Sequence, residues 1–145
     1  MIREGYAYIT RTWASGDTLE LALSLDILQV RAHPLVRANA GKAAIQRGPL
    51  VYCWESVDNG APISAVTLAA DPKLTSRFDP DLPGGAVVIE GAGWREEAES
   101  WNGELYRAAP RQAKSATLKA IPYYLWGNRG ENEMAVWIRE EASLV

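Results

Sequence analysis

The sequence is poor in the residue types that build disulfides, metal centres and membrane spans. Among its 145 residues there is one cysteine, Cys53, and one histidine, His33. A lone thiol excludes an internal disulfide, and one Cys with one His cannot supply the four ligands of a structural zinc site. No apolar stretch approaches the ~18 residues that a membrane-spanning helix needs. Neither a bound cofactor in this chain nor a membrane partner is therefore expected.

Charge of one sign is also scarce. The chain has 15 basic and 18 acidic residues, mixed along its length, and a net charge of −3. No basic stripe is present to neutralise phosphates, so nucleic acid is not an expected partner. The first residues, Met1–Tyr6, enter a strand-like pattern without the apolar core of a signal peptide. We therefore expect a soluble chain with no signal peptide and favour the cytoplasm as its location, although a domain taken from a longer protein would look the same.

What the chain has in abundance is alternation of period two. Within Asp17–Leu25, leucines occupy every second position from 19 to 25, which predicts one face of a half-buried strand. The preceding segment, Tyr6–Trp13, is rich in aromatic and β-branched residues. Because the link Ala14–Gly16 is short and contains glycine, the two segments are predicted to form a hairpin.

Further short strands are predicted between Gly- and Pro-containing turns, with a polar excursion at Trp94–Trp101. Such a pattern favours an all-β fold, an antiparallel β-sandwich of jelly-roll or Greek-key type with about nine to eleven strands. We expect one sandwich domain over residues 1–145, of which 1–33 are alternatively the closing hairpin of a preceding sandwich domain. The further predicted strands are Leu28–Ala32, Lys42–Gln46, Leu50–Trp54, Val66–Leu68, Leu74–Phe78, Ala86–Glu90, Leu105–Arg107, Ala116–Tyr124 and Met134–Arg139.

Residues suited to catalysis form no recognisable motif. A glycosidase needs two carboxylates about 5–10 Å apart, and the acidic residues of this chain fall in no such pattern, so most are expected to be solvated. Cys53 lies in the apolar run Leu50–Trp54 without a cationic neighbour, which predicts a packed, unreactive thiol.

The aromatic content is skewed, with six Trp and six Tyr against one Phe. Trp and Tyr combine an apolar face with a polar edge, and three interpretations remain open: packing in the core, burial against a neighbouring domain, or stacking on sugar rings. Consecutive strand residues point in opposite directions, so Tyr123 and Tyr124 cannot both enter the core. The candidates for inter-domain or sugar contact are Trp94, Trp101, Tyr123, Tyr124, Trp126 and Arg129.

Arg129 is a candidate because it lies in a Gly-flanked turn, where its guanidinium could donate to a carboxylate or carbonyl across a domain junction. The motif Gln46, Arg47, Gly48 and Pro49 is predicted to form a structural bend, since proline cannot donate to a strand ladder. There Arg47 is expected to satisfy carbonyls or a carboxylate.

Two stretches of the chain carry a family resemblance. One is Gly41–Asn59, which contains the Gln-Arg-Gly-Pro bend, and the other is Ile121–Gly130 with Met134–Ile138 behind it. Together with the opening Trp13–Asp17 turn, they resemble the C-terminal β-sandwich region of glycoside hydrolase family 127, the β-L-arabinofuranosidases, formerly a domain of unknown function.

The resemblance implies a parent enzyme that removes terminal L-arabinofuranose from plant-type glycans. In that family a helical barrel carries a zinc-bound cysteine nucleophile and a glutamate acid/base, and β-sandwich domains follow it. None of those catalytic motifs is found here, so the nucleophile role is not carried onto Cys53, and zinc would belong to the catalytic barrel of the parent.

We therefore expect a non-catalytic C-terminal accessory domain that supports the catalytic barrel, its predicted partner. Two alternatives stay open: a free-standing carbohydrate-binding module that uses exposed Trp and Tyr, and a protein-interaction domain.

Overall fold

The computed structural model of the protein describes residues 2–97, 101–108, 110 and 112–142. Within these residues the chain forms eleven strands joined by turns and short helical segments. The elements are β1 (Ile2–Arg3), β2 (Tyr6–Ala7), β3 (Ile27–Arg31), η1 (Arg37–Asn39), β4 (Lys42–Arg47), β5 (Leu50–Glu55), α1 (Ser56–Asn59), η2 (Ile63–Ala65), β6 (Val66–Leu68), β7 (Thr75–Asp79), β8 (Ala86–Glu96), β9 (Ala113–Pro122), η4 (Tyr123–Leu125), β10 (Met134–Ala135) and β11 (Ile138–Glu140).

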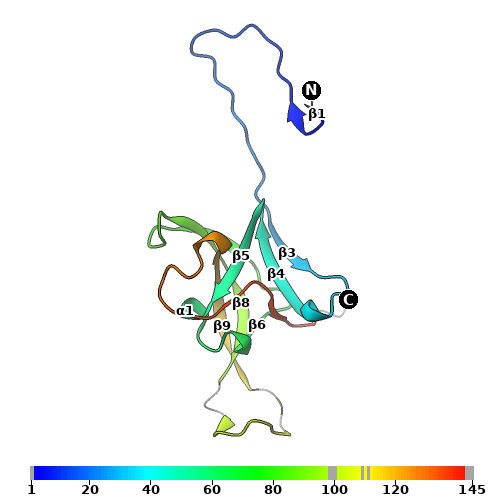
Figure 1. Ribbon diagram of the computed structural model, residues 1–145, viewed down its shortest axis with the longest axis vertical. Coiled ribbons are helices and arrows are strands. Elements are labelled where there is room, and N and C mark those ends of the chain that lie inside the picture. The colour runs from blue at the N-terminus through cyan, green and yellow to red at the C-terminus, as the bar shows by residue number, and fades with distance from the viewer. Residues whose placement is uncertain (1, 98–100, 109, 111, 143–145) are drawn as a thin grey trace.

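Nine of these strands belong to one sheet, in the order β10-β5-β9-β8-β6-β11-β4-β3, with β7 paired to β8 beside this path. An additional pairing between β4 and β5 closes the path, so that β5, β9, β8, β6, β11 and β4 surround a common interior. The pairings are antiparallel except that of β11 with β6, which is parallel. The predicted all-β, mostly antiparallel fold class is confirmed. The nine strands form one sheet that curls onto itself (Figure 1).

The interior is filled by one side chain or more from each strand of the closed path. Strand residues alternate between faces, and the inward positions carry apolar groups that are almost completely buried. These residues include Ile45, Tyr52, Trp54, Val66, Leu68, Ile89, Leu118, Ala120 and Ile138.

A second apolar cluster lies on the outer side of β5, β8 and β9. It brings together Cys53, Val88 and Ile121 with Leu82 and Leu125 from the loops that cover this part of the sheet. From Tyr52 onward, strand β5 is therefore buried on both faces, which explains why Tyr52, Cys53 and Trp54 form a continuous apolar run rather than an alternation.

The predicted N-terminal hairpin is wrong. Strands β1 and β2 are short and pair with each other, and residues 8–26 form an extended segment outside the sheet. Residues 2–26 project away from the body of the domain (Figure 1). Leu19, Leu21 and Leu23 are 65%, 76% and 69% exposed. The alternation is present in the sequence, but the structure offers these leucines no apolar surface on which a strand face could pack.

Several boundaries also differ from the prediction. Strand β8 continues to Glu96, so Trp94 lies on a strand and not in a polar excursion. The segment Leu105–Arg107 forms no strand, and β9 ends at Pro122, before the two tyrosines. No helix in the described part of the chain is long and apolar enough to cross a bilayer.

Candidate functional site

A group of exposed aromatic side chains lies on the loop between β9 and β10. Pro122 ends β9, and the chain then turns through η4. Tyr123, Tyr124 and Trp126 are 45%, 62% and 45% exposed, whereas Leu125 between them is buried in the outer apolar cluster. We call residues 123–133 the aromatic loop; one leucine anchors its first turn while three aromatic rings face outward.

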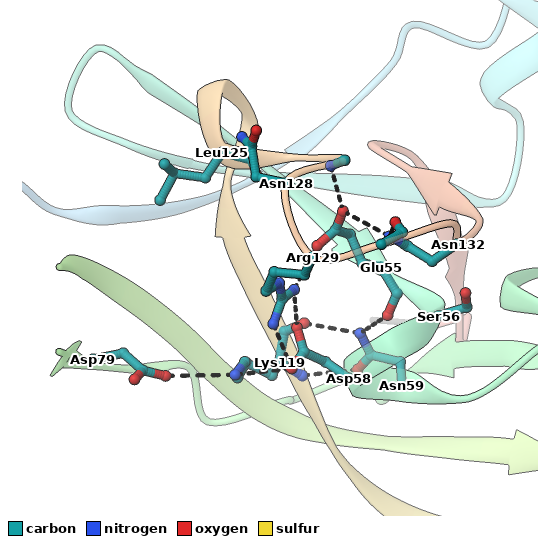
Figure 2. A network of polar contacts seen from close by, with 12 residues as sticks. Glu55, Ser56, Asp58, Asn59, Asp79, Lys119, Leu125, Asn128, Arg129 and Asn132 are labelled. Carbon is teal, nitrogen blue, oxygen red and sulfur yellow. Dashed lines mark hydrogen bonds and ion pairs between the residues drawn. The ribbon is translucent and has the colours of Figure 1, made fainter. Parts of the chain in front are cut away.

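The aromatic loop is held to the sheet by a charged pair beneath it. Glu55, the last residue of β5, has no exposed surface. Arg129 Nη2 lies 2.5 Å from Glu55 Oε2, and Glu55 Oε1 accepts hydrogen bonds from the backbone N–H of Gly127 at 2.8 Å and from the Asn132 amide at 3.3 Å. Both oxygens of a fully buried carboxylate are thus satisfied by three residues of one loop (Figure 2).

Asp58 extends this pair into a network. The Arg129 guanidinium donates to both Asp58 oxygens, at 3.0 and 2.5 Å, the two-pronged geometry that suits a planar guanidinium. On the other side, Lys119 Nζ lies 2.8 Å from Asp58 and 3.4 Å from Asp79. The network therefore ties the aromatic loop, α1, β9 and the end of β7 together (Figure 2).

The electrostatics of the network favour its charged form. Burial raises the pKa of Asp58, but hydrogen bonds from Arg129 and Lys119 outweigh that effect and leave this pKa below its ordinary value of 3.8. The hydrogen bond to Asp58 in turn raises the pKa of Arg129 above the usual guanidinium range, more than its burial lowers it. The carboxylate and the guanidinium stabilise each other as an ion pair.

Neutral hydrogen bonds complete the attachment of the helical turn α1. The Asn59 amide donates to the carbonyls of Glu55 and Lys119 and accepts from the Lys119 N–H, all at 2.9 Å. The Ser56 hydroxyl accepts from the Glu133 N–H at 2.9 Å, and the Ser56 N–H donates to the Glu133 carbonyl at 2.9 Å. The middle of the aromatic loop is therefore fixed by the ion pairs of Arg129, and its end at Glu133 by hydrogen bonds to Ser56.

The structure divides the predicted site residues into two groups. Tyr123, Tyr124 and Trp126 follow the C-terminal end of β9. Trp94 pairs with Ser115 near the start of that strand, and Trp101 lies in the preceding connection, where Arg107 stacks over its ring at 4.4 Å. Since the ten residues of β9 span about 33 Å, the six candidates do not form one surface.

Arg129 has a different environment from the one predicted. The sequence predicts that its guanidinium donates to a carboxylate or carbonyl across a domain junction. Its carboxylate partners are instead Glu55 and Asp58 of the same domain, and its side chain is only 18% exposed. Sequence reasoning missed this pairing because more than 70 residues separate Arg129 from either acid.

The bend at Gln46, Arg47, Gly48 and Pro49 joins β4 to β5 as predicted, with Arg47 opposite Leu50. Gln46 donates to the Gly48 carbonyl at 2.8 Å. Gly48 has a φ of +55°, which disfavours a side chain, and an added Cβ would lie 2.4 Å from Leu25 Cδ2. Burial raises the pKa of Tyr52, and the Arg47 charge opposes part of that rise.

None of these groups is arranged for nucleophilic or metal chemistry. Burial and, to a smaller extent, the nearby Glu55 charge raise the pKa of the Cys53 thiol to about 12, so thiolate ligation or attack is strongly disfavoured. The part of the chain that the structure describes contains no group of three His, Cys, Asp or Glu side chains able to hold a metal ion. The residues present do not fit a zinc centre, and the carboxylates of Glu55 and Asp58 are committed to Arg129.

Comparison with known proteins shows that this domain is similar to one region of larger proteins. A family model described as the glycoside hydrolase family 127 C-terminal domain matches residues 27–139. A non-reducing end β-L-arabinofuranosidase from Bifidobacterium longum subsp. longum is 41% identical over 147 aligned residues, which cover 95% of this chain and 22% of that protein.

Solved structures give the same result. The crystal structure of a GH127 β-L-arabinofuranosidase from Geobacillus stearothermophilus T6 matches with a TM-score of 0.76 and 50% identity, over 81% of this chain and 18% of that one. A second GH127 β-arabinofuranosidase structure matches with a TM-score of 0.69 and 30% identity, again over 81% of this chain and 18% of the other. The chain spans about a fifth of the length of these relatives.

Proposed function

This chain belongs to the family of glycoside hydrolase family 127 C-terminal domains, and we propose that its aromatic loop docks this accessory domain onto the catalytic part of a β-L-arabinofuranosidase-like enzyme. The observation that carries the proposal is the pairing of exposure with rigidity. Tyr123, Tyr124 and Trp126 expose large apolar surface, while buried hydrogen bonds and ion pairs fix the backbone on which they stand.

Rigid, exposed aromatic residues are typical of protein interfaces. Binding hot spots are enriched in Trp and Tyr, and side chains that are already ordered lose less conformational entropy on association. The loop satisfies both conditions. The length of the relatives indicates the partner. The matched region fills only 22% of the β-L-arabinofuranosidase from Bifidobacterium, so most of that protein lies in other domains.

The N-terminal segment supports a second point of attachment. Leu19, Leu21 and Leu23 alternate on one side of an extended chain and are largely exposed, and the family match begins only at residue 27. We propose that residues up to about Asp26 add strands to a preceding β-sandwich domain of the parent, where these leucines would be buried. The domain would then be joined to the parent by strand pairing at its start and by the aromatic loop.

The test is complementation. The parent polypeptide would be produced with and without residues 27–139, and its melting temperature and its hydrolysis of a chromogenic β-L-arabinofuranoside would be measured. We expect the deletion to lower both, and we expect the separately purified 145-residue chain, added back, to restore part of each. Hydrolysis by the 145-residue chain alone, or a deletion that changes neither property, would contradict the proposal.

A matched pair of variants assigns the effect to the aromatic loop. In the added chain, Tyr124→Ala should weaken the restoration, whereas Tyr106→Ala should not. Tyr106 is also an exposed tyrosine, at 92%, but it lies in the connection between β8 and β9. Equal loss with both variants would remove the loop from the docking surface.

A further inference from the structure

The outer face of β8 and β9 is uncovered around Trp94. On β8 the Ile89 side chain faces the interior, so by alternation Ala92 and Trp94 face outward. On β9 the outward residues opposite them are Thr117 and Ser115. Ala92, Ser115 and Thr117 are exposed, and Trp94 keeps 37% of its surface exposed.

Two cavities meet at this tryptophan. One has a volume of about 530 Å³ and reaches from Trp94 across Ala92 and Thr117 to Lys73 and Glu90. The other, of about 350 Å³, is lined by Trp94 together with Ala65 and Thr67 of the neighbouring segment. Both volumes fall in the range of small-molecule sites, about 300–1,000 Å³. Trp94 is the residue that the two linings share, and we call the two cavities together the groove.

The composition of the groove favours a sugar chain over a protein partner. Trp94 is the only large aromatic side chain that lines either cavity, among the described residues, whereas protein interfaces gather several large anchors near their centre. Most of the other lining residues are small or carry hydroxyl groups, among them Ala65, Thr67, Ala69, Thr75, Ala92, Ala113, Ser115, Ala116 and Thr117. A flat indole beside several hydroxyl groups suits a ring that has an apolar face and hydroxyl groups at its edge.

The charges at the rim of the larger cavity point to an uncharged ligand. Glu90 is paired with Arg77 at 2.8 Å, and Lys73 is paired with Asp71 at 2.5 Å. Glu96 and Glu141 line the smaller cavity; Glu96 is paired with Arg139 at 3.5 Å, and Glu141 accepts a hydrogen bond from the Ala70 N–H at 3.1 Å. Each charged group in the two linings therefore already has a partner. We propose that this groove binds a neutral oligosaccharide, with one sugar ring stacked on Trp94 and its neighbours in the two cavities.

The groove is independent of the aromatic loop. Trp94 lies near the start of β9, and the loop follows the end of that strand. The proposal therefore does not depend on the docking function. In the whole enzyme, a groove at this place would hold the glycan chain while one end of the domain contacts its neighbour.

The test is a titration of the 145-residue chain with a neutral arabino-oligosaccharide, followed by calorimetry and by NMR of the indole N–H groups. The six tryptophans provide six separate indole signals. We expect saturable binding with a Kd of about 1 mM and a shift of the Trp94 signal. Oligogalacturonide of equal length, which is anionic, should bind more weakly.

Three variants make the result specific. Trp94→Ala should weaken binding about tenfold or more through loss of stacking, and Thr117→Val, which keeps the side-chain volume, should weaken it less. Tyr106→Ala, which changes an exposed aromatic residue outside both cavities, should bind as the unchanged chain does. Absence of saturable binding, binding that Trp94→Ala does not weaken, or stronger binding of the anionic sugar would overturn the proposal.

Discussion

Arg129 forms an ion pair with Glu55, a carboxylate with no exposed surface that lies 74 residues earlier in the sequence. The same guanidinium also donates a hydrogen bond from each of its two terminal nitrogens to Asp58. A charge buried this deeply needs its partner, because removal from water costs several kcal/mol per ion. Arg129 is therefore essential to the folded aromatic loop.

Removal of Arg129 should destabilise the domain strongly. Arg129→Ala leaves the Glu55 charge buried without its partner, and we expect a loss of about 3–5 kcal/mol in the free energy of unfolding, measured by urea denaturation. The control is Arg31→Ala, which breaks the half-exposed pair with Glu140 and should cost less than about 1 kcal/mol.

The double variant Glu55→Gln with Arg129→Met should be more stable than Arg129→Ala, because no unpaired charge remains. Equal costs for Arg129→Ala and Arg31→Ala would mean that the buried pair contributes no more than a surface pair.

Acid should weaken the network through Asp58. Its pKa in the folded state is lowered below 3.8, because the hydrogen bonds from Arg129 and Lys119 outweigh its burial. A lowered folded pKa gives stability that is complete above the unfolded value and is lost as pH falls from there through the folded pKa. Denaturation at a series of pH values from 7 to 2.5 should therefore show a decline that begins near pH 4.

Asp58→Asn should lower stability at neutral pH and flatten that decline. Part of the decline should remain, since the pKa of Asp79 is also lowered: its burial is outweighed by the Asp81 N–H and by Lys119. A variant with the same acid sensitivity as the unchanged chain would show that Asp58 does not contribute to it.

Cys53 should be unreactive in the folded protein. Burial raises its pKa to about 12, and the side chain has no exposed surface. A thiol reagent at pH 8 should label it only as fast as the domain unfolds, and 8 M urea (about the strongest in common use) should make the reaction immediate. Labelling of the native protein at the rate of a free thiol would contradict the buried position.

Exposed and buried tryptophans should differ sharply in their effect on stability. Trp126 is 45% exposed and Trp54 is fully buried. Trp126→Ala should change the free energy of unfolding by less than about 0.5 kcal/mol, whereas Trp54→Ala should cost about 3–5 kcal/mol. If Trp54→Ala does not fold, Trp54→Phe gives the same comparison at lower cost. A large loss with Trp126→Ala would place that ring in the core.

Local patterns were enough to predict most of the sheet. The predicted bounds of Val66–Leu68 agree with the observed ones, and the apolar run at β5 is placed within one residue. Strand β5 directly follows Gly48–Pro49, Val66–Leu68 lies between Pro62 and Pro72, and both have partners on both sides. The hairpin at residues 6–25 failed for the opposite reason: alternation states which face seeks burial, but not whether the same chain supplies the surface.

The site was less accessible from the sequence. Tyr123 and Tyr124 were recognised because adjacent aromatic residues cannot share a strand face. The network beneath them was not predicted, since Glu55 and Arg129 meet only after β5 and β9 have paired. One feature of the sequence does indicate the pairing. Glu55 directly follows the apolar run Leu50–Trp54, and burial of a carboxylate there costs free energy unless a cation lies beside it.

The central claim is that the aromatic loop docks the domain onto the catalytic part of the parent enzyme. The most direct measurement compares the melting temperatures of Tyr124→Ala with Trp126→Ala, made together, in the 145-residue chain and in the parent polypeptide. We predict that the melting temperature of the isolated chain hardly changes. The melting temperature of the parent should decrease clearly, and its unfolding should no longer occur as one cooperative transition. A decrease of equal size in both, or no change in either, would contradict the account.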